Sequence, residues 1–299
     1  MFFPSLRFIR MKIVYLLFRC LARLISLLPF RVLYFVSGCL AFKLAYVFRY
    51  RRSVIDKNLL NSFPHLTAHE RKRIRKQYYR HIADLVMEVI KTRGMKISSF
   101  HQRFRIVNIE LMEKYLSQGK SVIIATGHLG NWEWFGVYMS TFPQYNPWAV
   151  VKPLSDKFFE QYLNSLRLKF ADKGLIDFKK AFREMVKMKA EPSIYLIAGD
   201  QTPTKDEINY WMDFLNQDTA VFLGVEKIAR SLGHVVLFMD LYRVKRGYYE
   251  ATFKLITEKP GQTEEFEITR THVQMLEQAI INRPYNWLWS HRRWKHSRS

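Results

Sequence analysis

His128 and Glu133 carry the side chains whose types and spacing best suit acid–base chemistry in this chain. The apolar, β-branched run 122–125 just before them has no polar alternation, which predicts a strand buried on both faces. The segment from Asn131 to Ser140 predicts the helix that follows. His128 is therefore expected in the turn at the carboxyl end of a strand, at the edge where open α/β sheets bind their ligands.

A histidine in this turn suits the role of a general base. When a hydroxyl attacks an acyl thioester, a neutral imidazole that removes its proton contributes about 10²–10⁴ in rate. The helix N-terminus just after His128 is expected to disfavour the imidazolium and keep the ring neutral, and Glu133 is expected to hold the second ring nitrogen. Residues five apart do not share a helix face, so the two side chains can meet only if His128 precedes the helix.

The glycines of this stretch support a tight turn. Gly127 and Gly130 give the backbone the freedom that such a turn requires. Backbone N–H groups near Gly130 and Asn131, or a nearby cation, would meet the developing oxyanion, which makes these two residues candidates for substrate binding. The same spacing also fits a turn histidine followed by a solvated acid in the first turn of a helix, so the spacing alone leaves both interpretations open.

The stretch 127–133, Gly-His-Leu-Gly-Asn-Trp-Glu, resembles the His-x4-acid motif of the lysophospholipid acyltransferase superfamily. With Glu133 as its acid, the motif resembles that of the lipid A late (lauroyl/myristoyl) acyltransferase family, which generally has Glu where glycerolipid acyltransferases have Asp. The resemblance covers most of the chain from about residue 51, through ordered matches at 51–64, 70–73, 150–153, Arg167, 198–201 and 287–295. Around Thr202 to Trp211 there is no close match.

This resemblance implies an enzyme that passes a fatty acyl group from an acyl thioester directly to a hydroxyl of lipid A or its precursor. It implies acyl carrier protein as donor and partner, with a coenzyme A thioester as the other possible co-substrate and no bound cofactor. It also implies the bacterial inner membrane, with the catalytic domain on the cytoplasmic face. A lysophospholipid, aminolipid or glycolipid acceptor stays open, and so does a non-catalytic basic protein that binds a membrane or nucleic acid.

Asp200 and Arg167 are two further candidate substrate-binding residues. Asp200 follows the apolar run 193–199, so it lies at the same sheet edge as His128 if the two strands are parallel. It could orient a basic residue or the acceptor, or only cap the following loop. Arg167 could bind phosphate or the carrier protein, or be a solvated cation.

Apolar runs alternate with helical patterns along the rest of the chain. Helices are expected at about 53–91 and 265–281, and a further strand at 247–257, antiparallel at one edge of the sheet. The other strands are expected at 104–107, 122–125, 148–151, 194–198 and 235–241. This alternation predicts an α/β fold with a mainly parallel sheet flanked by helices, and the resemblance makes it glycerolipid-acyltransferase-like.

The N-terminal segment 11–48 is rich in Leu, Phe, Tyr and Val, but cations interrupt it: Arg19, Arg23, Arg31 and Lys43. No uncharged run approaches about 18 residues, so the pattern predicts helices at the headgroup boundary with snorkelling cations, or a tilted or re-entrant insertion. The first helix should end at Pro29, before a second apolar piece at 32–48. A buried hairpin of a soluble protein is the alternative, although it would bury four cations. The expected domains are 1–48 (membrane anchor or interfacial helices), 49–100 (helical region) and 101–299 (α/β acyltransferase domain).

The formal charge of +22 implies an anionic partner. No zinc-finger spacing or RNA-recognition motif is present, so an anionic lipid acceptor, a membrane surface and the acidic carrier protein are favoured over nucleic acid. The C-terminal tryptophans Trp287, Trp289 and Trp294, interleaved with basic residues, are expected at a membrane interface, although nucleic-acid stacking uses the same residue types.

Other chemistries find little support in the sequence. The two cysteines, Cys20 and Cys39, lie away from every candidate motif and predict neither a disulfide framework nor a metal site. There is no Gly-x-Ser-x-Gly elbow, no Walker A loop and no His-Glu-x-x-His pair. Serine-based covalent catalysis, nucleotide hydrolysis and zinc chemistry are therefore not expected.

Overall fold

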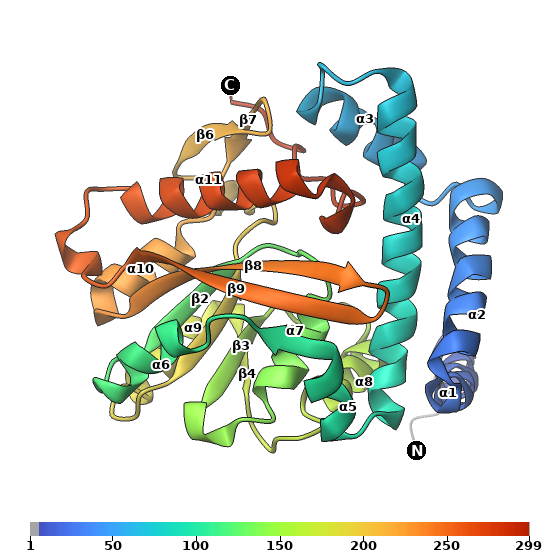
Figure 1. The fold of residues 1–299 in the computed structure, drawn as a ribbon, viewed down its shortest axis with the longest axis horizontal. Coiled ribbons are helices and arrows are strands. Elements are labelled where there is room, and N and C mark those ends of the chain that lie inside the picture. Colours follow the sequence, from blue (N-terminus) through green and yellow to red (C-terminus); the bar gives the residue numbers. More distant parts are fainter. Residues whose placement is uncertain (1–5, 299) are drawn as a thin grey trace.

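A seven-stranded sheet forms the centre of the computed structural model, which describes residues 6–298 (Figure 1). The strand order is β1-β9-β8-β2-β5-β3-β4, and only the pair β8 and β9 is antiparallel. The strands are β1 (Phe104–Ile106), β2 (Val122–Thr126), β3 (Pro147–Val151), β4 (Leu175–Asp177), β5 (Ile194–Ala198), β8 (Val235–Lys245) and β9 (Tyr248–Thr257). The chain is therefore α/β with a mainly parallel sheet, as the alternation of apolar runs predicted.

The strands expected from the sequence are all present, and the differences lie at the edges of the sheet. β9 is antiparallel to β8 as expected, but it is not an edge strand, because β1 pairs with its other side. Two features were not predicted from the sequence: β4 at the opposite edge, and the small hairpin of β6 (Trp211–Phe214) and β7 (Gln217–Ala220). These elements have only three or four residues each, too few to produce a recognisable periodicity.

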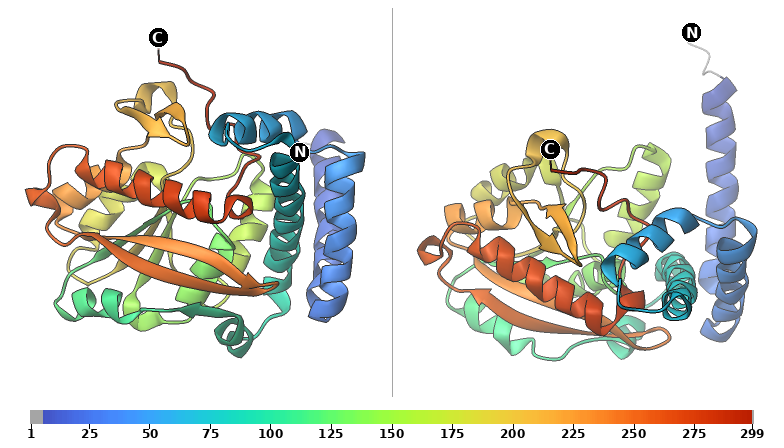
Figure 2. Two further views of the ribbon diagram at one scale, coloured as in Figure 1. Left: turned by 45° about the horizontal axis from the view of Figure 1, so that its top comes forward. Right: turned by 90° about the horizontal axis from the view of Figure 1, so that it is seen from above.

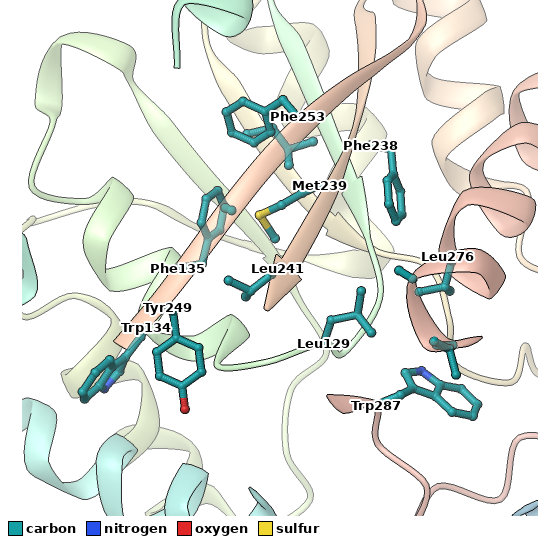
Figure 3. Close-up of a cluster of buried hydrophobic side chains, with 14 of the residues drawn as sticks. Leu129, Trp134, Phe135, Phe238, Met239, Leu241, Tyr249, Phe253, Leu276 and Trp287 are labelled. Atoms are coloured by element: carbon teal, nitrogen blue, oxygen red, sulfur yellow. The ribbon is translucent and has the colours of Figure 1, made fainter. Parts of the chain in front are cut away.

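Helices cover both faces of the sheet, so β2 is fully buried. Val122 and Ile124 belong to the core cluster shared with α7 (Trp132–Met139), whereas Ile123 and Ala125 belong to the cluster on the opposite face. Figure 3 shows part of the first cluster, with Trp134, Phe135 and Tyr249 at one end and Phe238, Leu276 and Trp287 at the other. The other helices around the sheet are α5 (Ile97–Arg103), α6 (Glu110–Ser117), α8 (Lys157–Arg167), α9 (Ala181–Lys187), α10 (Gly224–Leu232) and α11 (Glu267–Asn282).

The expected helical region consists of α3 (Arg52–Ser62) and the long helix α4 (Ala68–Lys91). Thr67 and Glu70 form a capping box at the start of α4, which satisfies two of the backbone N–H groups there. The C-terminal segment packs back on these helices, since Asn58 donates hydrogen bonds to the carbonyls of Trp289 and His291. The division at residues 48 and 100 stays a prediction.

The N-terminal helices lie on the side of α4 that faces away from the sheet (Figures 1 and 2). These are α1 (Leu6–Leu27) and α2 (Phe30–Phe42), with the break at Pro29 as expected. A π-helical stretch, Lys43–Val47, continues α2, and within residues 6–298 the combined stretch Phe30–Val47 is the one helix long and apolar enough to cross a membrane.

The exposed faces of these helices argue against a soluble hairpin. Leu17 is 66% exposed, Leu27 68% and Phe35 74%, and these belong to a larger set of exposed apolar side chains on both helices. Exposed apolar side chains in this number on neighbouring helices indicate a site of membrane or protein interaction. The cations Arg19 and Arg23 are also exposed rather than buried in a core.

Candidate active site

The turn after β2 and the turn after β5 lie side by side at the carboxyl edge of the sheet. The two strands are adjacent and parallel, with Thr126 paired to Ala198, so the residues that follow them meet. The turns are also tied together directly, because the Gly199 N–H donates to the Thr126 carbonyl at 3.0 Å. This alignment brings His128 and Asp200 together, which the sequence predicted on the condition that the strands are parallel.

Asp200 binds His128 through both of its carboxylate oxygens. Oδ1 lies 2.6 Å from His128 Nδ1, and Oδ2 accepts the His128 backbone N–H at 2.8 Å. A third donor, the indole N–H of Trp287, reaches Oδ2 at 2.7 Å. The side chain of Asp200 is only 2% exposed and that of His128 is 17% exposed, so the carboxylate is buried and the imidazole keeps a solvent-accessible part.

Gly127 allows this close approach. A Cβ atom at this position would lie 2.7 Å from Leu276 Cδ1 and 3.0 Å from Asp200 Oδ2. Any larger residue would therefore require Leu276 to shift and would crowd the carboxylate.

The pKa of His128 is shifted in the direction opposite to the one expected from the helix N-terminus. Burial alone would lower the pKa of His128, but the Asp200 carboxylate outweighs burial and raises the pKa above its ordinary value of 6.5. Burial would raise the pKa of Asp200. The adjacent imidazole and three hydrogen bonds outweigh burial and lower this pKa well below its usual range. The expected direction for His128 was wrong because a full charge at hydrogen-bond distance acts more strongly than the partial charge of a helix terminus.

Glu133 does not contact the imidazole. Its carboxylate accepts two hydrogen bonds from Arg167 of α8, from Nε at 2.8 Å and from Nη2 at 2.6 Å. The expectation that Glu133 holds the second ring nitrogen is corrected accordingly, since Asp200 occupies that position. Arg167 is likewise not a freely solvated cation. It forms a bidentate pair with Glu133, and the side chains of Arg167 and Glu133 are only 21% and 13% exposed.

Gly130 and Asn131 serve the turn itself. Gly130 has φ +54°, a conformation that favours glycine, and its N–H donates to the Asn286 carbonyl at 3.0 Å. Asn131 caps α7 by accepting the Trp134 N–H, and its amide donates to Glu88 at 2.8 Å. Neither residue lines the neighbouring cavity. An oxyanion role for the Gly130 N–H is therefore not supported.

A cavity of about 590 Å³ opens beside the imidazole. Its polar lining includes His128, Glu133, Arg167 and Gln201 together with Lys152, Lys173 and Glu207, and apolar side chains from α7, β3 and β5 line much of the remainder. The volume lies within the range of small-molecule and cofactor sites, about 300–1,000 Å³. The site thus combines a histidine–aspartate pair, an arginine–glutamate pair and a largely apolar cavity.

Gln201 is a further residue of this site, and its role was not predicted from the sequence. Its side-chain amide lies 3.2 Å from His128 Nε2, the ring nitrogen that Asp200 leaves unbound. The signal was present in the sequence, because Gln201 directly follows Asp200 at the end of the same strand.

The C-terminal tryptophans were expected at a membrane interface, and for two of them this was wrong. Trp287 is 1% exposed and Trp289 is 0% exposed. Their indole N–H groups bind inside the protein, to Asp200 and to the Pro284 carbonyl respectively. Residue type alone could not distinguish an indole that meets headgroups from one that satisfies a buried carboxylate.

Arg293 adds a buried cation behind the site. It is 3% exposed, and its Nε and Nη1 atoms have no hydrogen-bond partner. Burial lowers the pKa of Arg293 to about 10, partly offset by the charge of Asp200. Among residues 6–298 no cluster of three or more His, Cys, Asp or Glu that could hold a metal ion is found.

A family model described as bacterial lipid A biosynthesis acyltransferase matches residues 1–296. No curated protein matches the chain. The match spans the N-terminal helices, the histidine turn and the buried C-terminal segment alike.

Proposed function

This chain belongs to the bacterial lipid A biosynthesis acyltransferase family, and from that premise we propose that it transfers a fatty acyl group from acyl carrier protein to a hydroxyl of a lipid A precursor. His128 is the general base and Asp200 is the carboxylate that orients it. The observation that carries this assignment is the 2.6 Å hydrogen bond between His128 Nδ1 and the buried Asp200, beside the cavity.

The hydrogen bond determines which ring nitrogen acts. An ionised carboxylate can only accept, so Nδ1 carries the proton and Nε2 keeps its lone pair. The acceptor hydroxyl replaces the Gln201 amide at Nε2, gives its proton to this nitrogen and attacks the thioester carbonyl carbon. The C–S bond then breaks, and the imidazolium returns the proton to the leaving thiolate. The transfer is direct and forms no acyl-enzyme.

Asp200 stabilises the imidazolium that forms during the attack. Its charge raises the pKa of His128, which makes the ring a stronger base at the cost of a larger protonated fraction near neutral pH. The buried Trp287 N–H fixes the carboxylate in turn.

Arg167 is the cation that meets the oxyanion in this proposal. It lines the same cavity as His128, and its charge is close enough to lower the pKa of the imidazole. Glu133 holds Nε and Nη2, which leaves Nη1 with a single long contact to Asn164 at 3.4 Å. A guanidinium fixed in this way stabilises developing charge without reorganising. Glu133 is then a positioning residue that acts through Arg167.

The partners follow from charge and exposed surface. A net charge of +22 attracts an acidic carrier protein and an anionic membrane surface. The exposed apolar faces of α1 and α2 support attachment to the bacterial inner membrane. The catalytic domain then lies on the cytoplasmic face, where the carrier protein is available, and no role for nucleic acid is proposed.

The test uses the full chain in vesicles, with labelled acyl carrier protein and a lipid A precursor. We expect transfer by the natural chain and a loss of about 10²–10⁴ in rate for His128→Ala, with an unchanged circular dichroism spectrum. Rising salt should weaken use of the carrier protein more than use of a coenzyme A thioester, because screening acts on the larger charged surface.

Parallel assays with different acceptor lipids separate the alternative functions. Transfer to a lysophospholipid, aminolipid or glycolipid but not to the lipid A precursor would overturn the acceptor assignment. A chain that transfers to no lipid would favour the non-catalytic binding protein, and full activity of His128→Ala would remove the mechanism.

A further inference from the structure

We propose that Gly136 limits how far the fatty acyl chain extends into the cavity and thereby sets the chain length that the enzyme prefers. The inference rests on the proposed function and names a residue that selects the substrate. It depends on the course of the cavity and on what surrounds Gly136.

The cavity extends from the catalytic turn along the sheet. Its lining includes Ala198 at the carboxyl end of β5 and Ile194 at the other end. These two residues are four positions apart, so the lined stretch of β5 is roughly 13 Å long. Pro147, at the start of β3, lines the cavity beside Ile194, to which it is paired in the parallel register.

Helix α7 forms the opposite wall of this part of the cavity. Trp132, Glu133, Gly136, Met139 and Ser140 line it, which is the i, i+4 pattern of one helix face. Glu133 lies at the catalytic end, and Ser140 lies about 10 Å further along the helix axis. Gly136 is therefore near the middle of the wall, about 4.5 Å beyond Glu133.

Nothing in the local structure requires a glycine at position 136. The residue is inside an α-helix, where glycine is a poorer helix former than alanine, and its φ is not positive. No neighbouring atom lies within 4 Å of an added Cβ. Gly127 is different, because a Cβ there would collide with Leu276. Neither the backbone conformation nor the packing explains a glycine at position 136. We therefore attribute the glycine to the open space that its missing side chain leaves in the cavity.

A fatty acyl chain is the occupant that fits this space. Its thioester carbonyl must lie next to His128, and its hydrocarbon tail then has the cavity between α7 and the strands β3 and β5 to fill. Met139, Pro147, Ile194 and Leu196 present apolar surface along that course. A side chain at position 136 would project into the cavity about halfway along and stop a long chain there.

The experiment compares Gly136→Ala and Gly136→Leu with the natural chain, using acyl carrier proteins loaded with fatty acids of graded length. We expect Gly136→Leu to lose at least about tenfold in kcat/KM for the longest accepted donor relative to the shortest, since one methylene is worth about 10–200-fold in a fitted pocket. Gly136→Ala should shift the preference in the same direction by a smaller factor.

Gly261→Leu is the matched control. Gly261 also has no atom within 4 Å of an added Cβ, but it does not line the cavity. The Gly261→Leu variant should therefore prefer the same acyl-chain lengths as the natural chain. If thermal unfolding shows that Gly136→Leu is not folded, Gly136→Ala decides the question. An unchanged profile in folded Gly136 variants overturns the inference and leaves the proposed function intact, whereas a natural chain that uses no acyl thioester overturns both.

Discussion

His128 Nδ1 lies 2.6 Å from Asp200 Oδ1, although 72 positions separate the two residues in the chain. The carboxylate also binds the backbone N–H of the same histidine, so it fixes both the ring and the turn that carries it. The acid five positions after His128 instead forms a pair with Arg167. The histidine and the two acids therefore belong to two separate interactions beside one cavity.

The first prediction concerns the charge of Asp200. Asp200→Asn keeps the size of the side chain but removes the charge that stabilises the imidazolium and selects the tautomer. We expect kcat for acyl transfer to fall by about 10²–10⁴, with KM for the acyl donor nearly unchanged. Steady-state kinetics measures this, and a loss below threefold would show that Asp200 does not orient the base.

The pH dependence of the rate provides a second prediction. A general base works when deprotonated, and the pKa of His128 is raised above 6.5 by Asp200, so kcat/KM should rise with pH through an inflection above 6.5. In Asp200→Asn the burial of His128 would determine the direction of its pKa shift, so the inflection should move to lower pH. A profile of log kcat/KM against pH for both proteins checks the sign, and an upward move in the variant contradicts the assignment.

A third prediction separates the roles of the two acids. Glu133→Gln leaves Arg167 without its carboxylate partner, and we expect a loss in kcat together with a smaller downward move of the His128 inflection than in Asp200→Asn. Removing one partner of a buried pair typically costs about 3–5 kcal/mol, and less is expected here because both side chains are partly exposed.

The double variant is the control for this pair. Glu133→Gln with Arg167→Met removes both charges, so the loss of stability should be smaller than the sum of the two single losses. Additive losses in thermal unfolding would show that the two side chains do not act together.

The fourth prediction concerns membrane attachment. Leu17→Glu and Phe35→Glu place a charge on side chains that are 66% and 74% exposed, so folding should be little affected while the membrane-bound fraction falls. Flotation with anionic vesicles measures that fraction. The conservative variants Leu17→Ile and Phe35→Leu should stay bound, and unchanged flotation of the glutamate variants would show that these faces do not enter the membrane.

Elements that depend on neighbouring residues could be predicted from local sequence patterns. The buried strands at 122–125 and 194–198 follow from run length and residue type, the turn that carries His128 from the free backbone of its glycines, and the helix break from the restricted backbone of Pro29. The exposed apolar helices at the N-terminus follow from composition in the same way.

Which side chains meet in the site depends on the packing of segments that are distant in the chain. The parallel pairing of β2 with β5 gives His128 the carboxylate of Asp200, and the packing of α8 beside α7 gives Glu133 the guanidinium of Arg167. The fold also buried Trp287 under Asp200, where the sequence predicted a membrane interface. Spacing along one chain limits only near neighbours, whereas contacts between distant segments depend on how strands pair and helices pack, which no local pattern encodes.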